Sequence, residues 1–172
     1  MADFEGSYPC ERPPEELWQA INTPLRDPAL AGLVHEDLWV SYGDLEPNGQ
    51  IGLGTTITYV ASDEAIRRVA PVYRRFIPKD VDFYVARMSP EYEAGRQILR
   101  HDVLMSDKAD GSVTRTVEAD GEGSRLIVAA TLAIDGVGSM LDDKIRQALQ
   151  HCFGGPSENT VAIVSEILAS QR

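Results

Sequence analysis

The second half of the chain contains a run of alternating strands joined by short connections, and this feature limits the possible folds more than any other. Apolar and polar residues alternate with a period of two in four segments, residues 81–88, 96–105, 112–119 and 124–135. The connections carry turn residues, such as Asp110-Gly111 and Asp120-Gly121-Glu122-Gly123. None of them has room for a crossover helix, so consecutive strands pair antiparallel. The pattern predicts an antiparallel meander.

A single amphipathic helix is predicted after the last strand, from Ser139 to the end of the chain. Its apolar stripe includes Leu141, Ile145 and Leu149. Gly154-Gly155-Pro156 is expected to break or sharply kink this helix, because proline lacks the N–H group that a helix interior uses. One such helix can cover only one face of a sheet.

The first half supplies the remaining elements. Residues 2–10 are predicted to form an edge strand, and two short helices follow, each starting at a proline. A hairpin is expected from residues 38–42 and 51–59, with its turn at Pro47-Asn48-Gly49. Helical spacing also occurs over residues 62–77, where Pro71 splits the segment.

Together these elements predict an α+β fold in one domain, residues 1–172. Its curved antiparallel sheet of about seven strands wraps around a long C-terminal helix, with two short helices after the first strand. A long antiparallel sheet twists and curls. A helix laid across its concave side need not fill all the space beneath it, so a cavity lined by apolar side chains is expected there.

Composition and charge exclude several classes of partner. The 172 residues are 43% hydrophobic and carry a net charge of −11, and such a polyanion is repelled by nucleic acid and by anionic membrane surfaces. No stretch approaches the roughly 20 apolar residues of a membrane helix, so no membrane insertion is expected. The first residues lack the pattern of a signal peptide. The expected location is the cytoplasm.

Several segments resemble the START-like or helix-grip (SRPBCC) superfamily, which includes the major birch pollen allergen and bacterial polyketide cyclases. The resemblance covers nearly the whole chain. It rests on the first-helix segment 13–21 (PPEELWQAI) and on the long terminal helix. The segments 73–77, 123–128 and 140–145 are similar to a bacterial family within it whose activity is not settled. The resemblance implies binding of a hydrophobic ligand such as a lipid, a polyketide or an aromatic metabolite.

Strand parity selects the residues expected to line the cavity. Positions that share a face with apolar neighbours are taken as inward, and the terminal helix adds one residue. The expected lining consists of Tyr59, Phe83, Leu99, His101, Val103, Arg115, Val117 and Leu149. Aromatic residues at such positions are more often plain core than ligand contacts.

Two of these residues carry chemistry, and each has two interpretations. His101 either bonds a ligand or exchanges a proton with it, or it is a histidine satisfied by a neighbouring side chain. Arg115 either points inward and holds a ligand carboxylate or hydroxyl, or points outward as a solvated partner of Asp102 or Glu118. The cost of burying an unpaired charge favours the outward interpretation of Arg115.

Motifs for other chemistries are missing from the sequence. The three histidines have no ligand spacing, and no Cys-x-x-Cys or His-Glu-x-x-His occurs, so no metal is expected. No nucleotide-binding fingerprint, P-loop or nucleophile elbow is present, so no cofactor is expected and catalytic residues are unknown. Cys10 and Cys152 are expected to be buried and reduced.

Three functions remain open. The first is a carrier or sensor that binds an apolar metabolite, without catalysis. The second is a cyclase, aromatase or hydrolase acting in the same cavity, which needs several converging polar groups where the sequence offers few. The third is a protein that grips a partner through an exposed apolar patch. A monomer and a homodimer are both compatible with the sequence.

Overall fold

A computed structural model of the chain describes most of the elements expected from the sequence. The backbone is described for residues 1–23, 25–36, 38–42, 46–48, 52–61, 67, 80–87, 96–106, 109–134 and 141–171. Side chains are considered for residues 1–23, 25–36, 67, 111–133 and 141–171. Most of the predicted helix at residues 62–77 lies outside the described residues.

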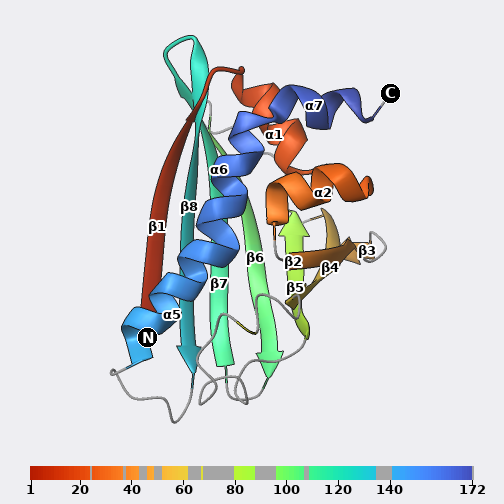
Figure 1. Cartoon of the computed structure of the whole chain (residues 1–172). Helices are drawn as coiled ribbons and strands as arrows, with labels where there is room; N and C mark the ends of the chain where they lie inside the picture. Colours follow the sequence, from red (N-terminus) through yellow and green to blue (C-terminus); the bar gives the residue numbers. More distant parts are fainter. Residues whose placement is uncertain are drawn as a thin grey trace.

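The strands form one antiparallel sheet with the order β1-β8-β7-β6-β5-β4-β2, and β3 also pairs with β4 (Figure 1). Their bounds are β1 Ala2–Cys10, β2 Leu38–Tyr42, β3 Glu46–Asn48, β4 Gly52–Ala61, β5 Asp80–Arg87, β6 Arg96–Ser106, β7 Ala109–Asp120 and β8 Gly123–Ile134. Strands β4 to β8 follow one another as a meander. Strand β1 pairs with β8, the last strand of this meander. The order of strands thus begins with β1 and ends with β2, and the predicted edge position of residues 2–10 is confirmed.

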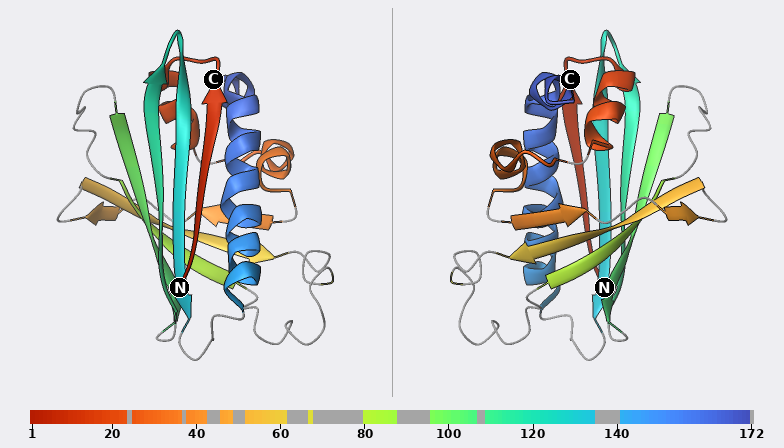
Figure 2. Two further views of the ribbon diagram at one scale, coloured as in Figure 1. Left: turned by 90° about the vertical axis from the view of Figure 1, so that its left-hand side faces the viewer. Right: turned by 90° about the vertical axis from the view of Figure 1, so that its right-hand side faces the viewer.

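The helices lie on one side of the sheet. Their bounds are α1 Pro14–Ile21, α2 Pro28–His35, α5 Asp142–Leu149, the π-helical turn η2 Gln150–Gly154, α6 Gly155–Ala162 and α7 Val164–Ala169. Segments α5, η2 and α6 pack on β1 and β8, and α2 lies beside α6 and β2. Figure 2 shows the sheet curving so that its β2–β4 edge turns towards the side of the helices. The predicted arrangement of a curved sheet around a C-terminal helix is confirmed.

Two predicted turns are parts of strands. Pro47 and Asn48 belong to β3 and pair with Leu53 and Gly52 of β4. Asp110 and Gly111 belong to β7 and pair with Ala133 and Leu132. Glycine is needed at position 111 for close packing rather than for a turn, since a Cβ there would lie 2.5 Å from the Thr131 carbonyl oxygen.

The predicted break at Gly154-Gly155-Pro156 is wrong. Both glycines have right-handed helical dihedral angles, with φ of −69° at Gly154 and −54° at Gly155. The helix passes through this point as a π-turn, in which the Gly155 N–H donates to the Gln150 carbonyl five residues earlier. This wider turn accommodates Pro156, which lacks an N–H group and would crowd a regular α-helical turn. The change of direction comes later, at Ile163, where φ is −122°.

The π-turn packs closely against strand β1. A Cβ added at Gly154 would lie 2.8 Å from the Phe4 Cζ and the Tyr8 hydroxyl oxygen. A Cβ at Gly6 would meet the same two side chains, at 2.9 Å and 2.5 Å. Phe4 and Tyr8 flank Gly6 on one face of β1, so they are held between two residues that have no side chain.

A buried core joins the helices to the β1–β8–β7 part of the sheet. Its largest fully buried side chains are aliphatic, with Leu17 from α1, Leu126 from β8 and Ile167 from α7 among them. Trp18 of α1 packs against this core and is half-buried. Burying each such side chain contributes about 1.5–3 kcal/mol.

The substitution Gly154→Ala is expected to lower the free energy of unfolding by about 1–3 kcal/mol, because the new methyl group must displace Phe4 or Tyr8. Gly155→Ala is the matched control, since a Cβ at Gly155 would meet no described heavy atom within 4 Å outside its own helix and chain neighbours. Alanine at position 155 has a higher helix propensity than glycine, but its methyl group crowds Pro156. Because these two effects oppose each other, the free energy of unfolding is expected to change by less than about 1 kcal/mol. Guanidinium unfolding of both variants measures the difference. Equal effects would contradict the close packing of the π-turn on β1.

Candidate functional site

The register of the sheet defines which residues share the face under the helices. On β8, the buried residues Leu126, Val128 and Ala130 alternate with more exposed ones. Directly opposite residues in an antiparallel pair lie on the same face. Starting from β8, the pairing register therefore identifies the inward positions of each remaining strand of the sheet.

Two neighbouring rows contain the residues that carry chemistry. One row runs from Val128 through Arg115 to Leu99, which are paired across β8, β7 and β6. The next row runs through Val113 to His101. His101 and Arg115 are therefore diagonal neighbours on one face, a relation that places Cβ atoms roughly 7–8 Å apart.

The remaining predicted residues lie at register positions of the same face. Val103 pairs with Phe83, which pairs with Ile57, and Tyr59 lies two residues beyond Ile57 on β4. The side chains of Tyr59, Phe83, Leu99, His101 and Val103 lie outside those described. Val117 and Leu149 are buried members of the core, so among the described residues they pack against other apolar side chains.

Arg115 lies on the covered face, and the outward orientation favoured by the sequence is wrong. It is flanked on β7 by Val113 and Val117, which are both buried. Its Nε atom is buried and has no hydrogen-bond partner among the described residues. No carboxylate of the described part of the chain lies within ion-pair distance of its guanidinium group.

His35 is a site residue that the sequence analysis did not select. It is the last residue of α2 and only 6% exposed. Burial, and to a smaller extent the positive charge of Arg115, together lower the pKa of its imidazole from 6.5 to about 4. His35 is therefore neutral at neutral pH, close enough to Arg115 to be affected by its charge.

Local contacts fix the position of His35. The Asp27 side chain caps the start of α2 by accepting a hydrogen bond from the Ala29 N–H at 2.9 Å. At the other end, the Asn159 side chain of α6 donates to the Val34 carbonyl and to the Glu36 carboxylate, both at 3.2 Å. These bonds hold α2 against the C-terminal helix.

A sequence signal for His35 did exist. Leu30 and Ala31 are half-buried, and Val34 and His35 follow four residues later on the same helical face. Extending this spacing to position 35 would have placed the histidine on the packed side of the short helix. The proximity to Arg115 could not be foreseen, because 80 residues separate the two in the chain.

The cysteines offer little nucleophilic chemistry. Both are free, with Cys10 buried and Cys152 half-buried. Burial raises the pKa of the Cys152 thiol to about 11, so this thiol is protonated at neutral pH. No group of three or more potential metal ligands occurs among the described residues.

A separate groove lies between α1 and α7. Its lining is largely polar and includes Arg12, Glu16, Gln19 and Ser165. An exposed hydrogen bond of 2.9 Å joins Gln19 to Gln171 across it. The groove contains none of the residues that the sequence predicts for the cavity.

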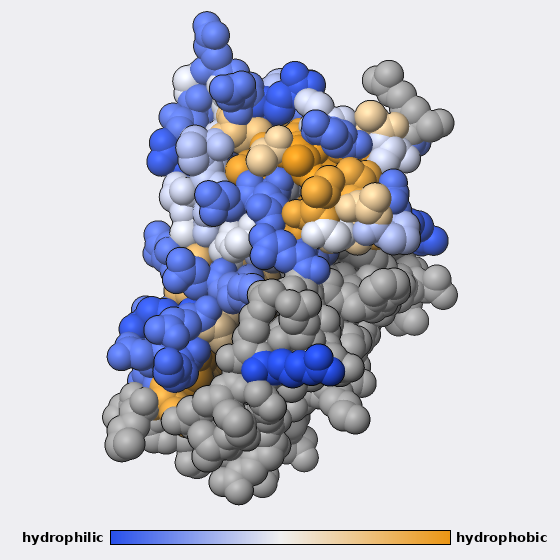
Figure 3. Space-filling view, viewed as in Figure 1, coloured by the Kyte–Doolittle hydropathy of each residue, from blue (hydrophilic) through white to orange (hydrophobic). Residues whose placement is uncertain are grey.

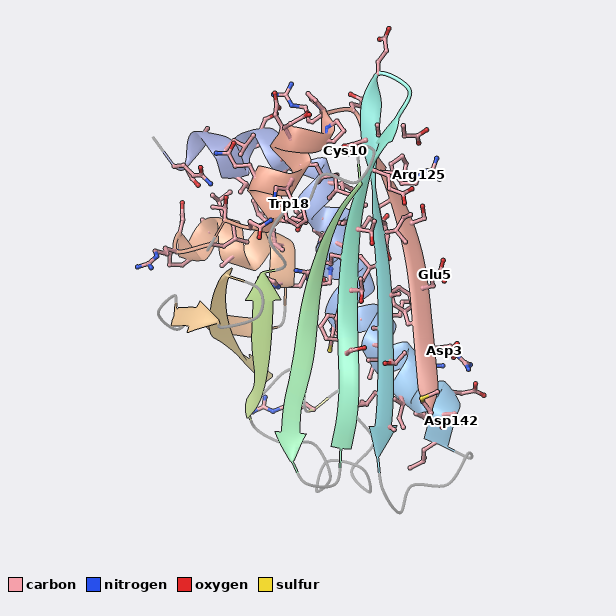
Figure 4. All side chains as sticks on the ribbon, turned by 180° about the vertical axis from the view of Figure 1, so that it is seen from behind. Asp3, Glu5, Cys10, Trp18, Arg125 and Asp142 are labelled. Carbon is pink, nitrogen blue, oxygen red and sulfur yellow. The ribbon has the colours of Figure 1, made fainter. Side chains whose placement is uncertain are left out.

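The surface has two contrasting faces. Figure 3 shows apolar residues gathered over α2, α6 and α7, where Leu33 is 58% exposed. Figure 4, seen from behind, labels Glu5 on β1 and Arg125 on β8, which belong to the face of the sheet turned away from the helices. In the described part of the chain, no helix is both long and apolar enough to cross a membrane.

Comparison with known protein families gives no match, and no curated protein matches in sequence. Solved structures do match along nearly the whole chain. Ara h 8.0201 has a TM-score of 0.60 at 18% identity, covering 95% of this chain and 97% of its own. Protein CV1439 from Chromobacterium violaceum has a TM-score of 0.60 at 16% identity, with coverages of 94% and 96%. XoxI from Bacillus cereus has a TM-score of 0.56 at 11% identity, with coverages of 100% and 99%.

These likenesses concern the fold, since all three identities are far below the level at which function follows. They agree with the features built up from the strands: an open antiparallel sheet, two short helices after the first strand, and a long C-terminal helix on one face. The chain has the helix-grip fold.

The lowered pKa of His35 makes a prediction about stability against pH. Between pH 6.5 and about 4 the unfolded chain binds a proton that folded His35 does not, so stability is lost as the pH falls through this range. In the wild-type protein, His35 should account for a loss of about 3 kcal/mol in the free energy of unfolding between pH 6.5 and about 4. The variant His35→Gln should lack this part of the pH dependence. Urea unfolding at several pH values measures this. His151→Gln, at an exposed position of η2, is the control and should keep the wild-type slope. A wild-type slope in His35→Gln would contradict the buried neutral imidazole.

Proposed function

We propose that the protein binds an apolar small molecule, in the cytoplasm, between the concave face of the sheet at β4–β6 and the helices. The observation that carries this proposal is the division of the covered face into two parts. On the β1–β8–β7 part, the C-terminal helix and α1 pack directly on buried aliphatic residues. On the β4–β6 part, the register continues the same face with Tyr59, Phe83, Leu99 and Val103.

The curvature of the sheet supports this location. The β2–β4 edge turns towards the helices, so strands β4 to β6 and α2 surround the concave side (Figure 2). Apolar walls with a few polar groups are typical of sites for small hydrophobic ligands. The helix-grip fold supports the same proposal, because hydrophobic ligand binding is common among its members.

Binding is favoured over catalysis by the groups that the structure describes. A general base works best when its pKa lies near the working pH. His35, with a pKa of about 4, is a weak base at neutral pH, and the Cys152 thiol is protonated. These two described groups are therefore poorly suited to proton transfer or nucleophilic attack at neutral pH.

Native mass spectrometry of protein purified from its own host tests the proposal. We expect an apolar molecule in a one-to-one complex, which is released when the protein is denatured and is then identified after extraction. An empty protein that also fails to bind fatty acids, sterols and aromatic polyketides would contradict the proposal.

A matched pair of variants tests where the ligand binds. Leu99→Trp adds a large side chain at an inward register position, and it should weaken binding of a neutral apolar probe roughly 10-fold or more by filling the site. Arg100→Trp places the same side chain at the next residue, on the opposite face of β6. Fluorescence titration should show wild-type affinity for Arg100→Trp. Equal affinities in the two variants would place the ligand elsewhere.

A further inference from the structure

Arg115 is a charged residue in an apolar part of the sheet. Its row neighbour Val128 is 0% exposed, and Val113 and Val117 on either side of it are 1% exposed. An arginine side chain keeps its positive charge in proteins. Removing such a charge from water without a compensating anion costs several kcal/mol.

The described part of the chain supplies no such anion. The acidic residues whose ion pairs are described, such as Asp3, Asp120 and Asp143, bind other arginines at exposed positions. The buried Nε of Arg115 has no hydrogen-bond partner among the described residues. The side chain as a whole is half-buried on the covered face, and a bound anion would supply the partner that this Nε atom has not found among the described residues.

His35 complements Arg115 at the same place. It is the last residue of α2, close enough to Arg115 for the guanidinium charge to affect its pKa, and the bonds of Asn159 to Val34 and Glu36 hold this end of α2. A neutral imidazole can donate one hydrogen bond and accept another. An arginine and a neutral histidine together can therefore donate to both oxygens of a carboxylate.

The position of the pair also defines the shape of the ligand. Arg115 lies on β7, at the boundary between the filled β1–β8–β7 part of the covered face and the apolar positions on β4–β6. Its partner on β6 is Leu99, and His101 is its diagonal neighbour. A ligand with its charged end at Arg115 would extend its apolar part along β6 towards Val103 and Phe83.

The charge of the whole protein makes this local arrangement more selective. With a net charge of −11, the protein repels anions over most of its surface. A carboxylate can be retained only where positive charge and hydrogen-bond donors are concentrated and shielded from water.

Resting on the proposed function, we propose that Arg115 and His35 bind the carboxylate of an amphipathic ligand whose apolar part lies along β4–β6. The ligand class is thus an apolar carboxylic acid rather than a neutral lipid, sterol or hydrocarbon.

Competition between a matched acid and alcohol tests this inference. The neutral dye N-phenyl-1-naphthylamine reports occupancy of the apolar site, and decanoate and 1-decanol compete for it at pH 7.5. In the wild-type protein, we expect decanoate to displace the dye at a concentration roughly 10-fold or more below that of 1-decanol, since hydrogen bonds to charged groups are strong. Arg115→Met should reduce this ratio to about 1 while the dye still binds.

Three further variants distinguish binding from folding effects. Arg125→Met is the matched control, because Arg125 lies on the opposite face of β8 and pairs with Asp120; it should keep the wild-type ratio. Arg115→Lys keeps the charge and loses the forked geometry, so an intermediate ratio is expected. His35→Gln should lower the ratio several-fold. If Arg115→Met does not fold, the competition ratios of the wild-type protein and of Arg115→Lys test the carboxylate site.

The outcomes separate this inference from the proposed function. A wild-type ratio near 1, or an unchanged ratio in the Arg115 variants, overturns the carboxylate site while dye binding still supports an apolar cavity. A wild-type protein that binds neither the dye nor the two competitors overturns the proposed function and this inference with it.

Discussion

The packing of the C-terminal helix on strand β1 determines the layout of the whole fold. Gly154 in the π-turn lies against Phe4 and Tyr8, which also enclose Gly6. This close approach fixes the helix over β1 and β8, at one side of the sheet. Because the helix is held at that side, its burial closes the core there and leaves the face of β4 to β6 to the curvature of the sheet and to α2. The location proposed for the ligand follows from this asymmetry.

A half-buried cation, Arg115, lies on the covered face at the boundary between the two parts and connects the fold to its proposed function. A core that only had to be stable would place an aliphatic residue at position 115, next to Val113 and Val117. If Arg115 binds an anion, as we propose, the ligand also stabilises the folded protein, because it binds the folded state alone. His35 is affected by the charge of Arg115 and adds no second charge, since it is neutral at neutral pH. In this proposal, Arg115 links stability to ligand binding. The aliphatic core of the β1–β8–β7 part beside it has no such link.

Most of the fold could be predicted from local sequence patterns. Alternation defined the strands, and the prolines defined the starts of α1 and α2. The π-turn could not be predicted, because Gly154-Gly155-Pro156 is a helix breaker by local rules and continues the helix only through its contact with β1. The inward face of Arg115 was missed because the general penalty for buried charge was given more weight than strand parity with the buried Val113 and Val117. The proximity of His35 to Arg115 depends on the packing of α2, which the sequence pattern does not contain.

The central claim is that the concave face at β4–β6 holds the ligand, and methyl NMR tests it most directly. A protein with labelled Leu, Val and Ile methyl groups would be titrated with decanoate, and shift changes would be mapped by residue. We predict the largest changes at Leu99 and Val103, with smaller changes at Val113 and Val117 beside Arg115 and none at Leu168 in the α1–α7 groove. Changes centred on Leu168, or no changes with decanoate or any other apolar compound, would contradict the account.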